Sequence, residues 1–122
     1  RAYIETVRNI TVRTEYLREQ GVAYTHPSNL SVITGFGESM GATFASGDPL
    51  IIDTGVNTVE VDGVYVFTLD DMLYIKRLQR LPKMIRMISD NETFPPYDIK
   101  GIELDGLIIH ARVLMAWNAR KL

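Results

Sequence analysis

The chain contains no cysteine and only two histidines among its 122 residues. The absence of cysteine excludes disulfides and thiolate metal sites, and two isolated histidines make a weak case for a metal or a catalytic triad. His26 lies in a polar turn, and His110 alternates with apolar residues on an expected strand, so a structural role is the simpler interpretation of both. Aspartates such as Asp48, Asp53 and Asp90 fall at turns, where hydrogen bonds to nearby backbone explain them. We therefore expect no metal site and no cofactor.

Long apolar runs and an excess of positive charge are also missing. No apolar run near either end approaches the roughly 18 residues of a membrane span, and no charged-then-apolar leader is present. We therefore expect a cytoplasmic protein without a membrane partner. A net charge of -2 offers no clustered basic surface for DNA phosphates, so any DNA binding is expected from another part of the protein. Because the chain begins at Arg1 without methionine, we expect that an upstream part is missing.

The length and composition are typical of one globular domain over residues 1–122. Apolar residues make up 46% of the chain and charged residues 23%, the usual balance for a domain with one core. Short apolar or alternating segments are separated by turn residues, which predicts a mainly β fold with one or two short helices. A helix is expected from Thr14 to Arg18, ended by Gly21. Strands are expected at 3–12, 30–34, 50–53, 63–69, 72–79, 84–89, 97–100 and 107–117.

The last of these segments, 107–117, is longer and more apolar than a free edge strand can safely be. Two interpretations fit it equally well. It is either a central strand of this domain or a segment that pairs two subunits.

Ser39 stands in a turn that is unusually rich in glycine. Three of the seven residues 35–41 are glycines, which indicates special backbone geometry directly after an expected strand. Such a turn can display a nucleophilic side chain and direct backbone N–H groups at a substrate oxygen. An ordinary turn serine is the simpler interpretation of Ser39 taken alone.

Lys76 interrupts a strand whose two faces are both largely apolar. Met72, Tyr74, Lys76 and Leu78 should point the same way, so the ammonium group is expected among apolar neighbours. Desolvation lowers the pKa of a lysine, and a neutral lysine could take a serine proton. The alternative is a lysine with a buried stem and a solvated head.

Four segments in order resemble the peptidase S24 family, which includes LexA and phage CI-like repressors. Residues 36–44 followed by 47–53 resemble its nucleophile motif, residues 74–82 its catalytic-lysine strand, and residues 88–96 the segment after that strand. Ser39 and Lys76 lie 37 residues apart, similar to the spacing in LexA-type proteins. Glu38 stands where the family often has aspartate, and Gly41-Ala42 replaces a common acidic residue and proline.

The resemblance implies a LexA C-terminal-domain-like β fold with a Ser39 and Lys76 dyad. Neutral Lys76 would deprotonate Ser39 for attack on a bond of the protein's own chain, and N–H groups near Glu38 and Ser39 would stabilise the oxyanion. It also implies the homodimerising, self-cleaving domain of a phage-type transcriptional repressor. The absent N-terminal helix-turn-helix domain would bind operator DNA, and a RecA filament would stimulate cleavage in the SOS response.

Other functions remain open because the chain lacks the Ala-Gly or Cys-Gly bond at which family members usually cut themselves. The bond then lies upstream of Arg1 or does not exist. A non-cleaving dimerisation and effector-docking domain, relieved by an antirepressor protein, is one alternative. An UmuD-like polymerase accessory protein with a short N-terminal arm is another. A signal peptidase would share the dyad chemistry, but the sequence gives no clear sign of a membrane anchor.

Overall fold

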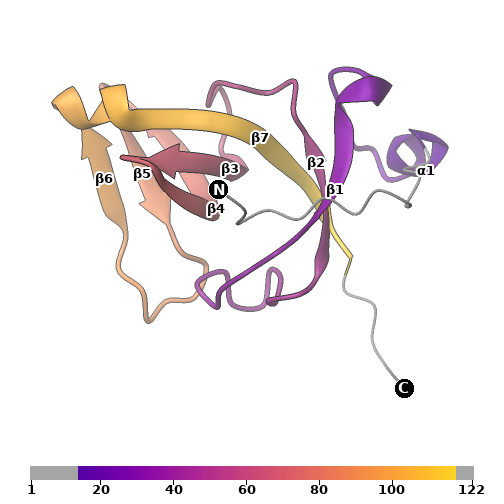
Figure 1. Cartoon of the computed structure of the whole chain (residues 1–122), viewed down its shortest axis with the longest axis horizontal. Helices are drawn as coiled ribbons and strands as arrows, with labels where there is room; N and C mark the ends of the chain where they lie inside the picture. Colours follow the sequence, from indigo (N-terminus) through magenta and orange to yellow (C-terminus); the bar gives the residue numbers. More distant parts are fainter. Residues whose placement is uncertain (1–13, 118–122) are drawn as a thin grey trace.

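A computed structural model describes residues 14–117 as one seven-stranded sheet with short helices, which confirms the expected mainly β fold (Figure 1). The strand expected at 3–12 lies outside the described residues. In the described part of the chain, no helix is long and apolar enough to cross a bilayer. The elements in chain order are α1 (Thr14–Glu19), η1 (Pro27–Asn29), β1 (Leu30–Thr34), β2 (Pro49–Asp53), β3 (Gly63–Leu69), β4 (Met72–Leu81), β5 (Met84–Ile88), β6 (Tyr97–Lys100), η2 (Gly101–Gly106) and β7 (Leu107–Ala116).

The final strand, β7, lies in the interior of the sheet and joins its two parts. The order is β1-β2-β7-β3-β4-β5-β6, and all neighbouring strands are antiparallel. In Figure 1, β7 runs from the group β3 to β6 across to β2 and β1. One backbone edge pairs with β2 over residues 112–116, and the other pairs with β3 over residues 107–113. The apolar run that the sequence left open is therefore a central strand.

The β3–β4 hairpin follows from its turn residues. Asp70 and Asp71 have φ values of 49° and 67°, and Leu69 pairs directly with Met72. Two successive left-handed residues give a turn whose twist matches that of the strands, and aspartate tolerates this conformation well. β4 extends two residues beyond the expected end because its last residues continue to pair with β5, up to Leu81 opposite Met84.

Helix α1 ends in a glycine motif that the sequence anticipated. Gly21 has a φ of 72°, its N–H donates to Arg18 O at 3.0 Å, and the Val22 N–H donates to Leu17 O at 2.9 Å. This pair of bonds satisfies the last carbonyl groups of the helix. Leu17 is fully buried and packs against Val32 of β1, which fixes the short helix to the sheet.

The core lies on both faces of the β3–β4 hairpin because side chains alternate along a strand. A first cluster contains Val66 and Ile75 together with Met40 and Phe44 from the connection between β1 and β2. A second cluster on the opposite face contains Tyr65, Phe67, Leu78, Val59, Ile85 and Ile109. The first cluster thus anchors the segment that carries Ser39.

Candidate functional site

Ser39 lies in the connection between β1 and β2, residues 35–48, which we call the Ser39 loop. Its side chain is half-buried, between the exposed Glu38 and the buried Met40, whose side chain is only 1% exposed. Gly37 and Gly41 have φ values of 79° and 56°, a region that L side chains rarely adopt. The left-handed glycines let the chain turn sharply, and the Met40 anchor holds Ser39 at the surface of the first cluster.

The two ends of the Ser39 loop are held together by Gly35 and its neighbours. The Gly35 N–H donates to Asp48 O and the Gly47 N–H donates to Gly35 O, both at 2.9 Å. A Cβ atom on Gly35 would lie only 2.8 Å from Cδ1 of Phe44. Glycine is therefore required here by a close approach of the Phe44 ring, not by its backbone angles.

A second loop, residues 89–96 between β5 and β6, contacts the Ser39 loop and is called the clamp loop. The Asn91 N–H donates to Ser39 O at 2.8 Å, and Asn91 Nδ2 donates to Glu38 O at 3.2 Å. In Figure 1 the two loops lie side by side below the sheet, as these bonds require. The clamp loop thus fixes the carbonyl group of the candidate nucleophile and that of the residue before it.

Asp90 ties the clamp loop to β4. Arg77 donates through Nε to Asp90 Oδ1 at 2.9 Å and through Nη2 to Oδ2 at 2.8 Å, and the Thr43 hydroxyl donates to Oδ2 as well. The bonds from Arg77 lower the pKa of Asp90 more than partial burial raises it, and the Thr43 hydroxyl lowers it further. The expectation that Asp90 bonds to local backbone is wrong, since its partners are side chains of β4 and the Ser39 loop.

Lys76 of β4 lies in the apolar setting that strand alternation predicted. Its ammonium nitrogen is 5.3 Å from the ring centroid of Tyr74 and 5.9 Å from that of Phe94 in the clamp loop. Burial lowers the pKa of Lys76, and no neighbouring charge opposes that effect. The half-buried lysine is thus predisposed to lose its proton.

Ser39 and Lys76 approach the clamp loop from two sides without bonding to each other. Ser39 contacts it through its carbonyl and Lys76 through the Phe94 ring. Within residues 14–117, the hydrogen bond of Ser39 is one in which its carbonyl oxygen accepts from the Asn91 N–H. In the same range, Lys76 has no ion pair and no side-chain hydrogen bond. β5 ends with Ile88 opposite Arg77, so the edge of β4 is open at Lys76.

The two histidines have structural partners. His26 Nδ1 accepts from the Ser28 N–H at 3.1 Å and caps η1. His110 is exposed, and its Nε2 lies 3.2 Å from the Thr68 hydroxyl. Within the described range, no group of three or more His, Asp or Glu side chains is placed to hold a metal ion.

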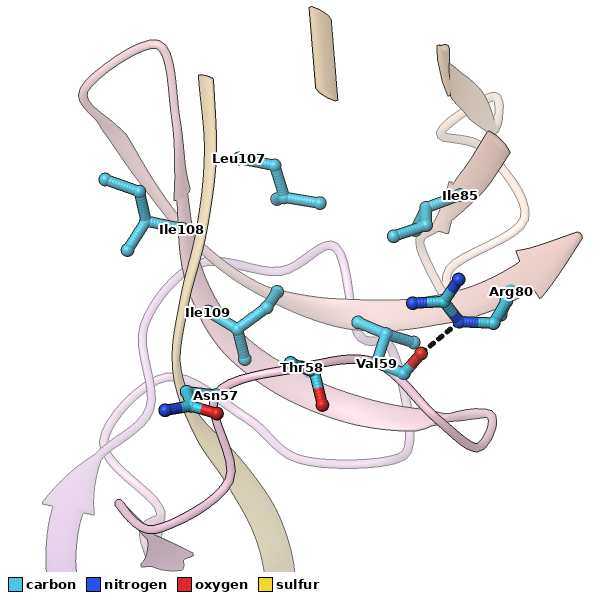
Figure 2. A pocket seen from close by; sticks show the side chains of 8 residues that line it. All are labelled: Asn57, Thr58, Val59, Arg80, Ile85, Leu107, Ile108 and Ile109. Carbon is cyan, nitrogen blue, oxygen red and sulfur yellow. Dashed lines mark hydrogen bonds between the residues drawn. The ribbon is translucent and has the colours of Figure 1, made fainter. Parts of the chain in front are cut away.

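A hollow of about 480 Å³ lies elsewhere, over the second cluster. Figure 2 shows the Arg80 guanidinium at one side, donating to the Val59 carbonyl, and Leu107 and Ile109 projecting from the same side of β7. Neither Ser39 nor Lys76 lines this hollow. The candidate catalytic residues therefore lie outside this hollow.

Sequence reasoning missed the role of the clamp loop. From the sequence, the segment Ile88-Ser89-Asp90-Asn91 shows only a family resemblance, Asp90 is explained by local backbone bonds, and Asn91 has no predicted role. The only available indication was an Asp-Asn pair next to a turn, which is common in surface loops. Asn91 contacts Glu38, which lies 53 positions earlier in the chain.

Comparison with known proteins gives matches over most of the chain. A model of the family described as Peptidase S24-like matches residues 2–114. The chain is also 34% identical over 113 residues to the 26 kDa repressor protein of Escherichia phage HK022. That match covers 93% of this chain and 48% of the phage protein, so the chain spans about half the length of this relative.

Proposed function

Because this chain belongs to the Peptidase S24-like family, we propose that it is the dimerising, latent self-cleaving domain of a phage-type repressor, with Ser39 and Lys76 as its dyad. The observation that carries the proposal is the placement of both residues against one clamp loop, with Lys76 in an apolar setting. An N-terminal helix-turn-helix domain upstream of Arg1 would bind operator DNA. The whole protein would act in the cytoplasm.

The proposed reaction is a serine-lysine acyl transfer. The uncharged Lys76 amine takes the proton of Ser39 Oγ, which attacks a carbonyl carbon of the protein's own chain. The N–H of Ser39 donates to the developing oxyanion, and the protonated Lys76 then gives its proton to the leaving amine. Water hydrolyses the resulting ester on Ser39 and restores the hydroxyl.

A side-chain rotation separates the resting state from the reactive one. In the resting state the Lys76 ammonium lies over Tyr74 and Phe94. It reaches Ser39 by turning around the open edge of β4, where β5 has ended. We propose that a RecA filament or the cleavage segment stabilises the turned state, which accounts for latency.

The dyad is tested in a protein extended upstream to include its natural sequence. Incubation at alkaline pH should yield two fragments, because more Lys76 is neutral as the pH rises. Ser39→Ala and Lys76→Ala should abolish cleavage, whereas the exposed controls Ser46→Ala and Lys100→Ala should not. Gel electrophoresis and mass spectrometry measure the products. Cleavage that survives either dyad substitution refutes the mechanism.

A non-cleaving dimerisation and effector-docking domain is the second candidate. It is favoured by the lack of an Ala-Gly or Cys-Gly bond in this chain and by the separate positions of Ser39 and Lys76. β7 lies between β2 and β3, so we propose that a dimer through this region packs exposed side chains such as Ile108 and Trp117, each 54% exposed. An antirepressor protein would then relieve repression.

Sedimentation and incubation with RecA distinguish these candidates. Sedimentation velocity of the wild type and of Ile108→Asp measures dimerisation, which the substitution should weaken under either candidate. Complete cleavage of the extended protein in the presence of a RecA filament would refute the non-cleaving alternative. A short upstream arm in place of a DNA-binding domain would instead favour a polymerase accessory role.

A further inference from the structure

Asn91 helps to set the direction of a backbone N–H group next to the candidate nucleophile. Glu38 O accepts from the Gly41 N–H of the same loop and from Asn91 Nδ2 of the clamp loop, both at 3.2 Å. The Glu38 carbonyl and the Ser39 N–H belong to the same planar trans peptide unit, in which C=O and N–H point in opposite directions. Fixing the carbonyl toward the clamp loop therefore points the Ser39 N–H away from that loop.

The orientation of the Asn91 amide is itself set by its neighbours. Its Oδ1 accepts from the Thr93 N–H at 3.1 Å and from the Thr93 hydroxyl at 2.8 Å. Two donors on Oδ1 assign the oxygen and leave the NH2 group facing Glu38. Thr93 thus holds Asn91 in the orientation that donates to the Ser39 loop.

The next peptide unit along the chain is held by the same residue. The Asn91 N–H donates to Ser39 O at 2.8 Å, which fixes the unit joining Ser39 to Met40. The Ser39 N–H donates no hydrogen bond to any of residues 14–117, so it is available to a substrate oxygen. Asn91 therefore bonds to two successive peptide units, the first of them together with the Gly41 N–H, and leaves a backbone donor unused beside the hydroxyl.

We propose that Asn91 is a positioning residue that pre-orients the Ser39 N–H toward the oxyanion. This inference rests on the proposed self-cleavage function. Asn91 does not touch the reacting atoms and acts through the Glu38–Ser39 peptide unit. Preorganised donors stabilise a transition state because they need not reorient when charge develops.

The kinetic test uses Asn91→Ala in the extended protein, with the neighbouring exposed Glu92→Gln as the matched control. Deleting one oxyanion donor costs about 100- to 1000-fold in rate. Asn91→Ala loosens that donor without deleting it, so we expect the plateau rate of self-cleavage at alkaline pH to fall about 10- to 100-fold. The apparent pKa of the rate profile should not move, because Lys76 contacts Phe94 and not Asn91. Thr93→Val should cause a smaller loss by removing one of the two bonds that orient the amide.

A second measurement needs no cleavage. The ¹⁵N order parameter of the Ser39 amide should fall from a rigid value near about 0.85 toward about 0.6 in Asn91→Ala and stay unchanged in Glu92→Gln. An amide that remains rigid overturns the inference, and so does a plateau rate equal to that of Glu92→Gln. A shifted apparent pKa with an unchanged plateau would mean that the substitution acts on Lys76, which also overturns it. If the extended wild-type protein never cleaves itself, the proposed function fails, but the order parameter still decides whether Asn91 positions the Ser39 amide. If Asn91→Ala does not fold, Thr93→Val supplies the test.

Discussion

Gly35→Ala should destabilise the protein through one steric contact with Phe44. The added Cβ would lie 2.8 Å from Cδ1 and 2.9 Å from Cε1 of the ring, well inside the roughly 3.5 Å at which carbon atoms begin to repel. The ring cannot easily withdraw, because Phe44 is 2% exposed and packs with Ile33, Met40 and Leu50. Alanine tolerates the backbone here, since the φ of Gly35 is not left-handed. The cost should be that of overpacking, about 1 to 3 kcal/mol.

A double-mutant cycle isolates this contact. Phe44→Leu removes Cε1 and replaces the rigid ring by a shorter, flexible side chain that can turn away from the new methyl group, at its own cost of a cavity. Gly35→Ala with Phe44→Leu should therefore be less destabilised than the sum of the single variants, by about 0.5 to 3 kcal/mol. Gly37→Ala is the matched control, because its φ is 79° and nothing lies within 4 Å of its new Cβ. It should cost about 1 to 2 kcal/mol from strain alone and add to Phe44→Leu.

Urea unfolding followed by far-ultraviolet circular dichroism measures all of these variants. The reasoning fails if Gly35→Ala and Phe44→Leu are simply additive, or if Gly37→Ala couples to Phe44→Leu as strongly. Since Phe44 and Met40 pack in the same cluster, a displaced ring should also disturb the position of Met40.

Two further predictions concern charges around the site. Burial lowers the pKa of Lys76, so the unfolded chain binds more protons than the folded one between the folded pKa and about 10.4, and stability should rise with pH across that window. Lys76→Met should remove this rise in parallel urea titrations, and equal slopes for both proteins would contradict it. The pKa of Asp90 is lowered by Arg77, so its contribution to stability is present above about pH 3.9 and is lost as the pH falls through the folded pKa. Asp90→Asn should cost about 1 kcal/mol at pH 7, a modest value because the Arg77 side chain is 38% exposed, and the difference should vanish in acid; a gap independent of pH would refute this.

The sequence determined most of the local structure. Alternating side chains and turn residues placed the β3–β4 hairpin, and the left-handed Asp70 and Asp71 supplied its turn. Strand alternation also placed Lys76 among apolar neighbours, which the rings of Tyr74 and Phe94 confirm. These features depend on residues close together in the chain, so local propensity and periodicity are enough to predict them.

Other features were decided only by the tertiary structure. The helix η2, six residues of 3₁₀ geometry before β7, has no apolar period that would have predicted it. The position of β7 between β2 and β3 depends on strand order, which periodicity does not encode. For the same reason the sequence alone could not choose between a central strand and an interface.

The same distinction between local pattern and tertiary structure applies to the candidate site. The sequence by itself selected Ser39 and Lys76 through the resemblance of four ordered segments to the peptidase S24 family, since each residue taken alone favoured an ordinary structural role. Only the tertiary structure brought Asn91 to the carbonyl of Glu38, 53 residues earlier, and joined Asp90 to Arg77 and Thr43. Hydrogen bonds between distant loops depend on how the sheet folds them together, and no pattern of neighbouring residues records that approach.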